Sequence, residues 1–177
     1  MRYTTKPGLK YFWLIRHARS SHTASSDFER GLSASGRADG ELMADFLRTT
    51  LQDSEHVPGW LITSAAKRAQ QTSDYVASAF NVSSEQVNVE RSLYLAEPEA
   101  LLAALQETPA DAGCVALVAH NPGLTWLVND LSEDNQQLEN FPTLGCALFA
   151  SNVDRWSDIH QANRVSLFTP KGVGRKV

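Results

Sequence analysis

The chain contains two uninterrupted apolar runs, at 11–15 and 114–119. Runs of this length without polar alternation are typical of strands that are covered on both faces of a sheet. Shorter apolar runs predict further strands at 60–63, 87–89, 146–150 and 165–169. We expect the last two of these to be antiparallel strands.

Segments with the spacing of amphipathic helices lie between these runs. Ser33 is suited to cap a helix that ends near residue 51. The predicted apolar face of this helix consists of Leu42, Met43, Phe46 and Leu47. Further helices are expected at 65–80, from Pro98 onward, and at 122–131. Strands that alternate with helices predict an α/β sandwich with a mainly parallel sheet.

Composition limits the classes of protein that fit. The 177 residues include 42% hydrophobic and 20% charged residues and show no repeat or linker, so we expect one domain over 1–177. The net charge of −4 argues against a general nucleic-acid or membrane-surface binder. No apolar run approaches the roughly 20 residues of a membrane-spanning helix, and the N-terminal run has no signal-peptide cleavage pattern. We therefore expect a cytoplasmic monomer.

The two cysteines, Cys114 and Cys146, both lie within apolar runs. Neither forms part of a CxxC or Cys/His pattern, so we expect two buried thiols and no structural metal.

Basic residues follow three of the predicted strands. Arg16 and His17 come directly after the first apolar run, Arg68 follows the run at 60–63, and His120 follows the run at 114–119. In open α/β sheets, ligands bind outside the carboxyl ends of the strands. These side chains are therefore expected at one edge of the sheet, which would form a basic site in an acidic chain.

Such a group of residues is suited to phosphoryl transfer. A neutral histidine nitrogen can attack phosphorus when a hydrogen bond from its other nitrogen, often to a backbone carbonyl, fixes the tautomer. Arginine forks match the phosphoryl oxygens in geometry and charge, and a second, protonated histidine adds a donor. The sequence shows no carboxylate cluster that would hold Mg²⁺, so we expect neither a metal nor another cofactor.

Each of these residues also has an ordinary interpretation when it is taken alone. A histidine at a strand end is commonly a solvated or core residue, and an arginine such as Arg68 in a first helical turn is commonly on the surface. Their shared position after apolar runs favours a site. His22, His56 and His160 lack that position, and we interpret them as surface or loop residues.

The motifs at these positions resemble those of a known family. RHARS at 16–20, SAAKRAQQT at 64–72 and AHNP at 119–122 are similar, in order and separation, to the signatures of the phosphoglycerate-mutase-like histidine phosphatase superfamily. The short chain and the DFERGLS segment at 27–33 most resemble its SixA-type phosphohistidine phosphatases. This resemblance implies a three-layer α/β/α sandwich with His17 and His120 after neighbouring central strands.

The resemblance also implies roles for single residues. His17 would be the phosphorylated nucleophile, and the phosphoryl group would be bound by Arg16, Arg68 and His120. Asp27 and Arg30 match positions near the pocket, and Arg30 would add a phosphate or substrate contact. Ser20 and Asn121 are further candidates for phosphate contacts, although an ordinary loop role fits each of them equally well.

One departure from the family pattern concerns the general acid. Mutase-like members carry a glutamate in an LxE element, where this chain has Leu93-Tyr94-Leu95. Glu97 is nearby and is a candidate acid, but with Pro98 it is more typical of a helix start. An imidazole leaving group, with a conjugate-acid pKa of about 6.5, needs less protonation than an alkoxide.

These observations favour phosphohistidine on a signalling or phosphotransfer protein as the substrate. The short loops agree, because an open pocket admits a protein side chain. A broad or small-molecule phosphomonoesterase that uses Asp27 or Glu97 as its acid is the first alternative, and a non-catalytic phosphoprotein-binding module is the second. The sequence leaves open whether the polar segment 132–143 selects the partner.

Overall fold

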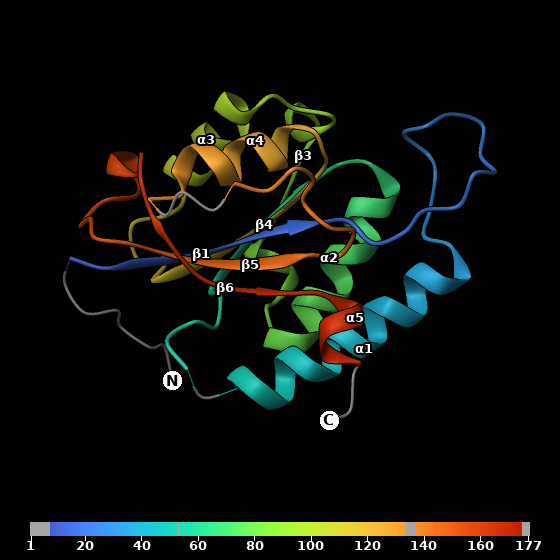
Figure 1. The fold of residues 1–177 in the computed structure, drawn as a ribbon, viewed down its shortest axis with the longest axis horizontal. Coiled ribbons are helices and arrows are strands. Elements are labelled where there is room, and N and C mark those ends of the chain that lie inside the picture. The colour runs from blue at the N-terminus through green and yellow to red at the C-terminus, as the bar shows by residue number, and fades with distance from the viewer. Residues whose placement is uncertain (1–7, 53, 134–136, 175–177) are drawn as a thin grey trace.

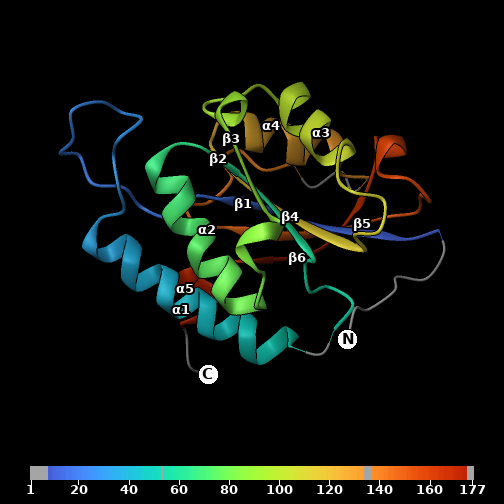
Figure 2. The same ribbon diagram turned by 180° about the vertical axis from the view of Figure 1, so that it is seen from behind.

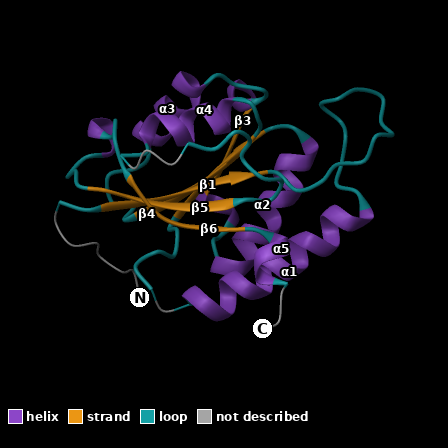
Figure 3. Cartoon of the chain, in the orientation of Figure 1, coloured by secondary structure: helices purple, strands orange, loops and turns teal. Residues whose placement is uncertain are grey.

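The computed structural model describes residues 8–52, 54–133 and 137–174, and a mixed β-sheet lies at its centre (Figures 1 and 3). The strands of this described part are β1 (Lys10–Arg16), β2 (Trp60–Ser64), β3 (Val87–Glu90), β4 (Cys114–Ala119), β5 (Cys146–Ser151) and β6 (Asn163–Phe168). Their order across the sheet is β3-β2-β4-β1-β5-β6. The first four are parallel, whereas β5 is antiparallel to both β1 and β6. The prediction of a mainly parallel sheet with late antiparallel pairing is confirmed.

Helices cover both faces of the sheet. They are α1 (Ala34–Leu51), α2 (Lys67–Phe80), α3 (Pro98–Gln106), α4 (Gly123–Leu131) and the short α5 (Pro170–Val173). The first two and α5 lie on one face, and α3 and α4 lie on the other, as the front and back views show (Figures 1 and 2). The three-layer α/β/α sandwich is therefore confirmed.

The central strand β1 explains why both faces need a cover. Its side chains alternate between the two sides of the sheet, because successive Cβ atoms of a strand point to opposite faces. Phe12 and Leu14 are buried in the core beneath α3 and α4. Trp13 and Ile15 are buried in the core beneath α1 and α2. The uninterrupted apolar run thus becomes a strand that contributes to two cores.

The apolar face predicted for α1 is wrong at one position. Leu42 is 40% exposed, and the buried residues of this helix include Gly40, Met43 and Leu47. A Cβ atom on Gly40 would lie 2.6 Å from the Tyr75 ring, so α1 approaches α2 through this glycine. That close approach sets the rotation of the helix and leaves Leu42 outside.

The ends of the helices follow local capping rules. Ser33 caps α1, where its Oγ accepts a hydrogen bond of 3.0 Å from the Gly36 N–H. Pro98 occupies the first turn of α3, where a missing N–H is tolerated. The predicted helix at 65–80 begins two residues later, at Lys67, and α5 was not predicted.

Two further sequence expectations have an outcome in the structure. Cys114 and Cys146 are both free and buried, which confirms the expectation of buried thiols. Within the described ranges, none of the helices is both long and apolar enough to cross a membrane.

Candidate active site

The two central histidines meet at the carboxyl edge of the sheet. His17 directly follows β1 and His120 directly follows β4, and these two strands are hydrogen-bonded neighbours. The backbone N–H of His17 donates to the carbonyl of Ala119 at 3.1 Å, which extends the ladder to the histidine itself. The two imidazole rings have their centroids 5.0 Å apart.

A pocket of about 360 Å³ opens at this edge. Its lining consists of Arg16, His17, Ser20, Asp27, Arg30, Arg68, Leu95, His120 and Asn121. Eight of the nine site residues proposed from the sequence therefore lie around one cavity. The ninth, Glu97, does not line it, because this exposed residue directly precedes α3. Its place fits the helix-start interpretation.

The orientation of His17 leaves one ring nitrogen available as a nucleophile. Its Nδ1 lies 2.8 Å from the carbonyl oxygen of Ala18. A carbonyl only accepts hydrogen bonds, so Nδ1 carries the proton and the lone pair resides on Nε2. Burial lowers the pKa of His17 from its ordinary 6.5 to about 4, and the nearby guanidinium of Arg68 adds to this effect. The ring is therefore neutral at pH 7.

Arg68 lies against this unprotonated nitrogen. It belongs to the first turn of α2, and its Nε–H donates to His17 Nε2 at 3.3 Å. Its Nη1 and Nη2 donate to the backbone carbonyl and to Oδ2 of Asp27, at 2.6 and 2.9 Å. The arginine side chain is almost fully buried, so its direction is fixed by these partners.

Asp27 connects two arginines of the pocket, Arg68 and Arg30. Its Oδ2 accepts from Arg68 and also from the Tyr94 hydroxyl at 2.7 Å, while its Oδ1 accepts from Arg30 Nη1 at 2.9 Å. The hydrogen bond from Tyr94, followed by the contacts of both arginines, lowers the pKa of Asp27 to about 2. This carboxylate is therefore ionised at neutral pH and cannot serve as a general acid.

The loop before α1 brings Asp27, Arg30 and Ser20 to the pocket. Its stem is closed by a hydrogen bond of 2.8 Å from Ser21 N to the Gly31 carbonyl and by a bridge between Ser20 and Leu32. Arg30 spans the loop, because its Nε donates to the Ser21 carbonyl at 2.6 Å and its Nη2 to Ser20 Oγ at 2.7 Å. The loop thus holds its polar side chains toward the site.

Arg16 and Asn121 meet at the backbone of Phe141. Arg16 Nη1 and Asn121 Nδ2 both donate to the Phe141 carbonyl, at 2.8 and 3.0 Å. Arg16 Nε is buried and has no hydrogen-bond partner among the described residues. The segment 132–143, apart from 134–136, which lie outside the described residues, thus contributes a positioning carbonyl to the site.

His120 forms the opposite wall of the pocket. Its Nε2 lies 2.8 Å from Ser64 Oγ, and its buried Nδ1 has no partner among the described residues. Burial lowers the pKa of His120 to about 3, and His17 and Arg68 lower it further. The expectation of a protonated second histidine is therefore not met in the free pocket. A bound phosphoryl dianion would raise this pKa.

Three supporting residues were missed by the sequence reasoning. Ser64 orients His120, and Tyr94 packs edge-on against the His120 ring, with centroids 5.7 Å apart. Thr72 Oγ1 accepts from the Ala18 N–H at 3.0 Å and donates to the Arg68 carbonyl at 2.7 Å. Ser64 and Thr72 are the first and last residues of the second motif, which was a signal that could have identified both.

The arrangement is suited to a tetrahedral oxyanion. Arginines 16, 30 and 68 surround the neutral imidazole of His17, and both Arg16 Nε and His120 Nδ1 have hydrogen-bonding capacity left. In the part of the chain that the structure describes, no three His, Cys, Asp or Glu side chains gather as a metal site.

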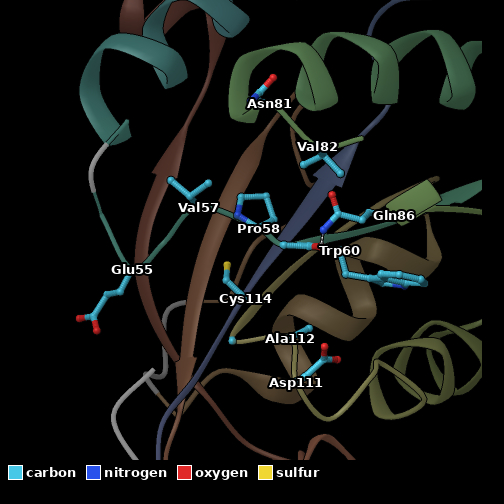
Figure 4. Close-up of a pocket in the computed structure, with 12 residues that line it drawn as sticks. Glu55, Val57, Pro58, Trp60, Asn81, Val82, Gln86, Asp111, Ala112 and Cys114 are labelled. Atoms are coloured by element: carbon cyan, nitrogen blue, oxygen red, sulfur yellow. Dashed lines mark hydrogen bonds between the residues drawn. The ribbon is translucent and has the colours of Figure 1, made fainter. Parts of the chain in front are cut away.

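A second hollow lies at the opposite, amino edge of the sheet (Figure 4). It has a volume of about 260 Å³ and is lined by parts of the segments 55–60, 81–86 and 111–114. The buried Cys114 thiol is part of this lining, and burial raises its pKa above the ordinary thiol value. None of the catalytic candidates contributes to this hollow.

Comparisons with known proteins agree with this fold. A phosphoglycerate mutase from Bacillus anthracis superposes with a TM-score of 0.68 at 12% identity, covering 95% of this chain and 96% of that chain. The chain therefore has the fold of the phosphoglycerate-mutase-like phosphatases. No family model and no curated protein sequence matches the chain.

Two structures of SixA proteins superpose more closely. A protein assigned as the phosphohistidine phosphatase SixA of Nakamurella multipartitia gives a TM-score of 0.79 at 24% identity, covering 93% of this chain and 99% of that chain. The protein histidine phosphatase SixA in complex with tungstate gives 0.74 at 22% identity, covering 91% and 97%. The similarity extends over nearly the whole of both chains.

Proposed function

We propose that this chain is a phosphatase that forms a phosphohistidine intermediate on His17 and hydrolyses phosphohistidine on another protein. The observation that carries the proposal is the 2.8 Å contact between His17 Nδ1 and the Ala18 carbonyl, which leaves Nε2 as the nucleophile. The lowered pKa keeps this nitrogen unprotonated at neutral pH. A protein with the same fold forms a complex with tungstate, a tetrahedral oxyanion, and this supports an oxyanion as the ligand of this chain.

The reaction has two displacement steps. In the first, a bond forms between His17 Nε2 and phosphorus, the phosphorus–nitrogen bond of the substrate breaks, and the departing imidazole takes a proton from water. In the second, water attacks phosphorus, the bond between phosphorus and His17 Nε2 breaks, a proton from the water passes to solvent, and inorganic phosphate leaves. Arg16 and Arg68 would stabilise the charge on the phosphoryl oxygens in both steps.

Arg68 would have to change partners when the substrate enters. Its Nε–H donates to His17 Nε2 in the free pocket, which occupies the lone pair that must attack phosphorus. A phosphoryl oxygen offers this donor a stronger, charge-assisted acceptor than a neutral ring nitrogen. Asp27 would retain the other end of the guanidinium through two hydrogen bonds, so a small rotation suffices.

The choice of phosphohistidine over phosphate esters rests on the absence of a suitable acid. Asp27 is the one carboxylate among the described lining residues, and its pKa of about 2 leaves it without a proton. An alkoxide leaving group depends on a proton donor in the site, whereas an imidazole, with a conjugate-acid pKa of about 6.5, can take its proton from solvent. The site is therefore suited to cleave a phosphorus–nitrogen bond.

The test is to measure phosphate release from a phosphohistidine-bearing protein and from an alkyl phosphate, both in excess EDTA. We expect fast release from phosphohistidine alone, abolished in His17→Ala and retained in His160→Ala, a matched variant of an exposed histidine outside the pocket. Equal release from the alkyl phosphate would indicate a broad phosphomonoesterase. The absence of His17-dependent release from either compound would favour a phosphoprotein-binding module.

A further inference from the structure

Leu95 differs from every other residue that lines the pocket. Among the described lining residues it alone has no polar side-chain atom. Its side chain is 50% exposed, although large apolar side chains gain from burial. A half-exposed leucine at the mouth of a strongly polar pocket needs a reason other than core packing.

The backbone at Leu95 is also unfavourable. Its φ angle of 51° lies in the left-handed region, where the Cβ atom of an L-residue is crowded by the following carbonyl. Leu144 has a similar φ of 50°, but it is 2% exposed, so burial of its side chain offsets the cost. Leu95, at 50% exposed, has much less of this compensation. Backbone strain with little packing gain is a feature of functional sites.

The residues on both sides of Leu95 are firmly held. The hydroxyl of Tyr94 donates to Asp27, and its ring packs edge-on against Phe28 with centroids 5.0 Å apart. On the other side, the Ala96 carbonyl lies so close to α4 that a Cβ atom on Gly123 would come within 2.0 Å of its oxygen. These anchors fix the turn and present the Leu95 side chain to the pocket.

We propose that Leu95 contacts the leaving group of the substrate and favours a flat ring over a polar, hydroxyl-bearing group. The phosphoryl group would be held at His17, and the leaving group of an in-line displacement points away from the nucleophile, toward the mouth of the pocket. An apolar side chain there packs against an imidazole ring but offers hydroxyl groups no hydrogen bond in place of those they make with water. The inference rests on the proposed phosphatase function and names the residue that selects the leaving group.

Two small substrates can distinguish the loss of a contact between Leu95 and the leaving group from a general loss of activity. Phosphoimidazole and phosphoramidate both contain a phosphorus–nitrogen bond, but only the first has a ring on its leaving group. We expect Leu95→Ala and Leu95→Gly to lower kcat/KM for phosphoimidazole by about tenfold, since they remove the apolar contact. For phosphoramidate we expect a change of less than about twofold, because the phosphoryl contacts remain intact.

Stability provides a second readout. Leu95→Gly removes the same side chain but tolerates the left-handed backbone, so its urea midpoint should equal or exceed that of the wild type. Leu42→Ala, which truncates a similarly exposed leucine on α1 outside the pocket, should leave both substrates unaffected. A Leu95→Gly variant that is as stable as the wild type and loses kcat/KM for phosphoimidazole alone would support the contact.

The contradicting results are distinct. Equal losses on both substrates, an unchanged rate with phosphoimidazole, or a marked loss of stability in Leu95→Gly would each overturn the role of Leu95 while leaving the phosphatase in place. Absence of His17-dependent hydrolysis of either compound by the wild type would instead overturn the proposed function, and the inference about Leu95 with it.

Discussion

The two edges of the same sheet hold two hollows of very different chemistry. At the carboxyl edge, Arg16, Arg30 and Arg68 surround His17 and His120, and each of these cations or rings is held by a specific hydrogen bond. At the amino edge, the lining includes two acidic residues, a proline and a buried thiol (Figure 4).

This difference follows from where the strands end. The parallel strands β1, β2 and β4 bring the residues that follow them to one edge, while the opposite edge collects the turns that precede β2, β3 and β4. The presence of a cavity therefore says little about function. The charges and hydrogen bonds of its lining distinguish the two hollows, and of the two the one at the carboxyl edge has the cationic lining that suits an anion.

The largest expected difference between the two edges concerns Arg68. Arg68→Ala removes a charge-assisted donor beside the nucleophile, so kcat/KM for phosphohistidine should fall by about a hundredfold or more. Arg68→Lys should restore little, because a lysine lacks the planar fork. Steady-state kinetics of both variants would measure these effects.

Glu55→Gln is the matched variant at the amino edge. It removes a charge from the second hollow but keeps an oxygen that can accept from the Tyr11 hydroxyl. We expect kcat/KM within about twofold of the wild type, because Glu55 lines the hollow at the amino edge and is not among the residues that line the pocket of His17. A comparable loss in Glu55→Gln and Arg68→Ala would break the distinction between the edges.

Asp27→Asn tests whether this carboxylate positions the arginines of the pocket. It weakens the contacts that orient Arg68 and Arg30, so kcat should fall by about tenfold, in line with the strength of hydrogen bonds to charged groups. Removal of the negative charge should at the same time tighten inhibition by inorganic phosphate. The inhibition constant of inorganic phosphate and kcat would be measured for Asp27→Asn and for the wild type. A variant with weaker phosphate inhibition and unchanged kcat would contradict the positioning role.

Ser64→Ala is expected to have a smaller effect, about threefold to tenfold on kcat/KM, because the hydrogen bond to the neutral His120 is lost together with a longer one, of 3.3 Å, from the Ala66 N–H. Ser151→Ala is the control: Ser151 is also buried, makes one hydrogen bond, and lies opposite Lys10 at the other end of β1. Equal kinetics in the two variants would show that Ser64 only supports the fold.

The pH dependence of stability should reflect the same pocket. The pKa of His17 is about 4 and that of His120 about 3 in the folded chain, against 6.5 ordinarily. The unfolded chain therefore binds protons that the folded chain does not, and the free energy of unfolding should decrease as the pH falls from 6.5 toward 4. Above pH 6.5 these two groups should contribute no slope.

Urea denaturation at a series of pH values checks this expectation. Substitution of both pocket histidines by asparagine should flatten the dependence between pH 6.5 and 4, whereas His160→Asn, at an exposed position, should leave it largely unchanged. The same slope in the double variant and the wild type would show that other groups control stability in this range.

The sequence predicted the elements that carry their own local signal. Uninterrupted apolar runs located β1 and β4, and capping chemistry at Ser33 and Pro98 located two helix starts. His17 and His120 could be placed together because parallel strands must end at one edge. The exposed Leu42 was predicted as buried, since periodicity does not reveal that α1 approaches its neighbour through Gly40.

The parts that could not be predicted depend on contacts between distant segments. Tyr94 reaches Asp27 across 67 positions of the sequence, and Arg16 finds the Phe141 carbonyl across 125. Backbone carbonyls leave no trace in a sequence, because every residue has one. At Leu95 the sequence showed only that the glutamate of the family pattern is missing. The exposure and the left-handed backbone of this residue are visible only in the three-dimensional structure.

The most direct test of the account is to trap the intermediate and identify the nitrogen that carries the phosphoryl group. The enzyme would be mixed with a labelled phosphohistidine protein, quenched in alkali within milliseconds to seconds, and digested for mass spectrometry and isomer-specific detection. The account predicts an alkali-stable, acid-labile label on His17 at Nε2, because Nδ1 is engaged by the Ala18 carbonyl. A label on Nδ1 or on another residue, or turnover with no labelled enzyme at any time, would contradict it.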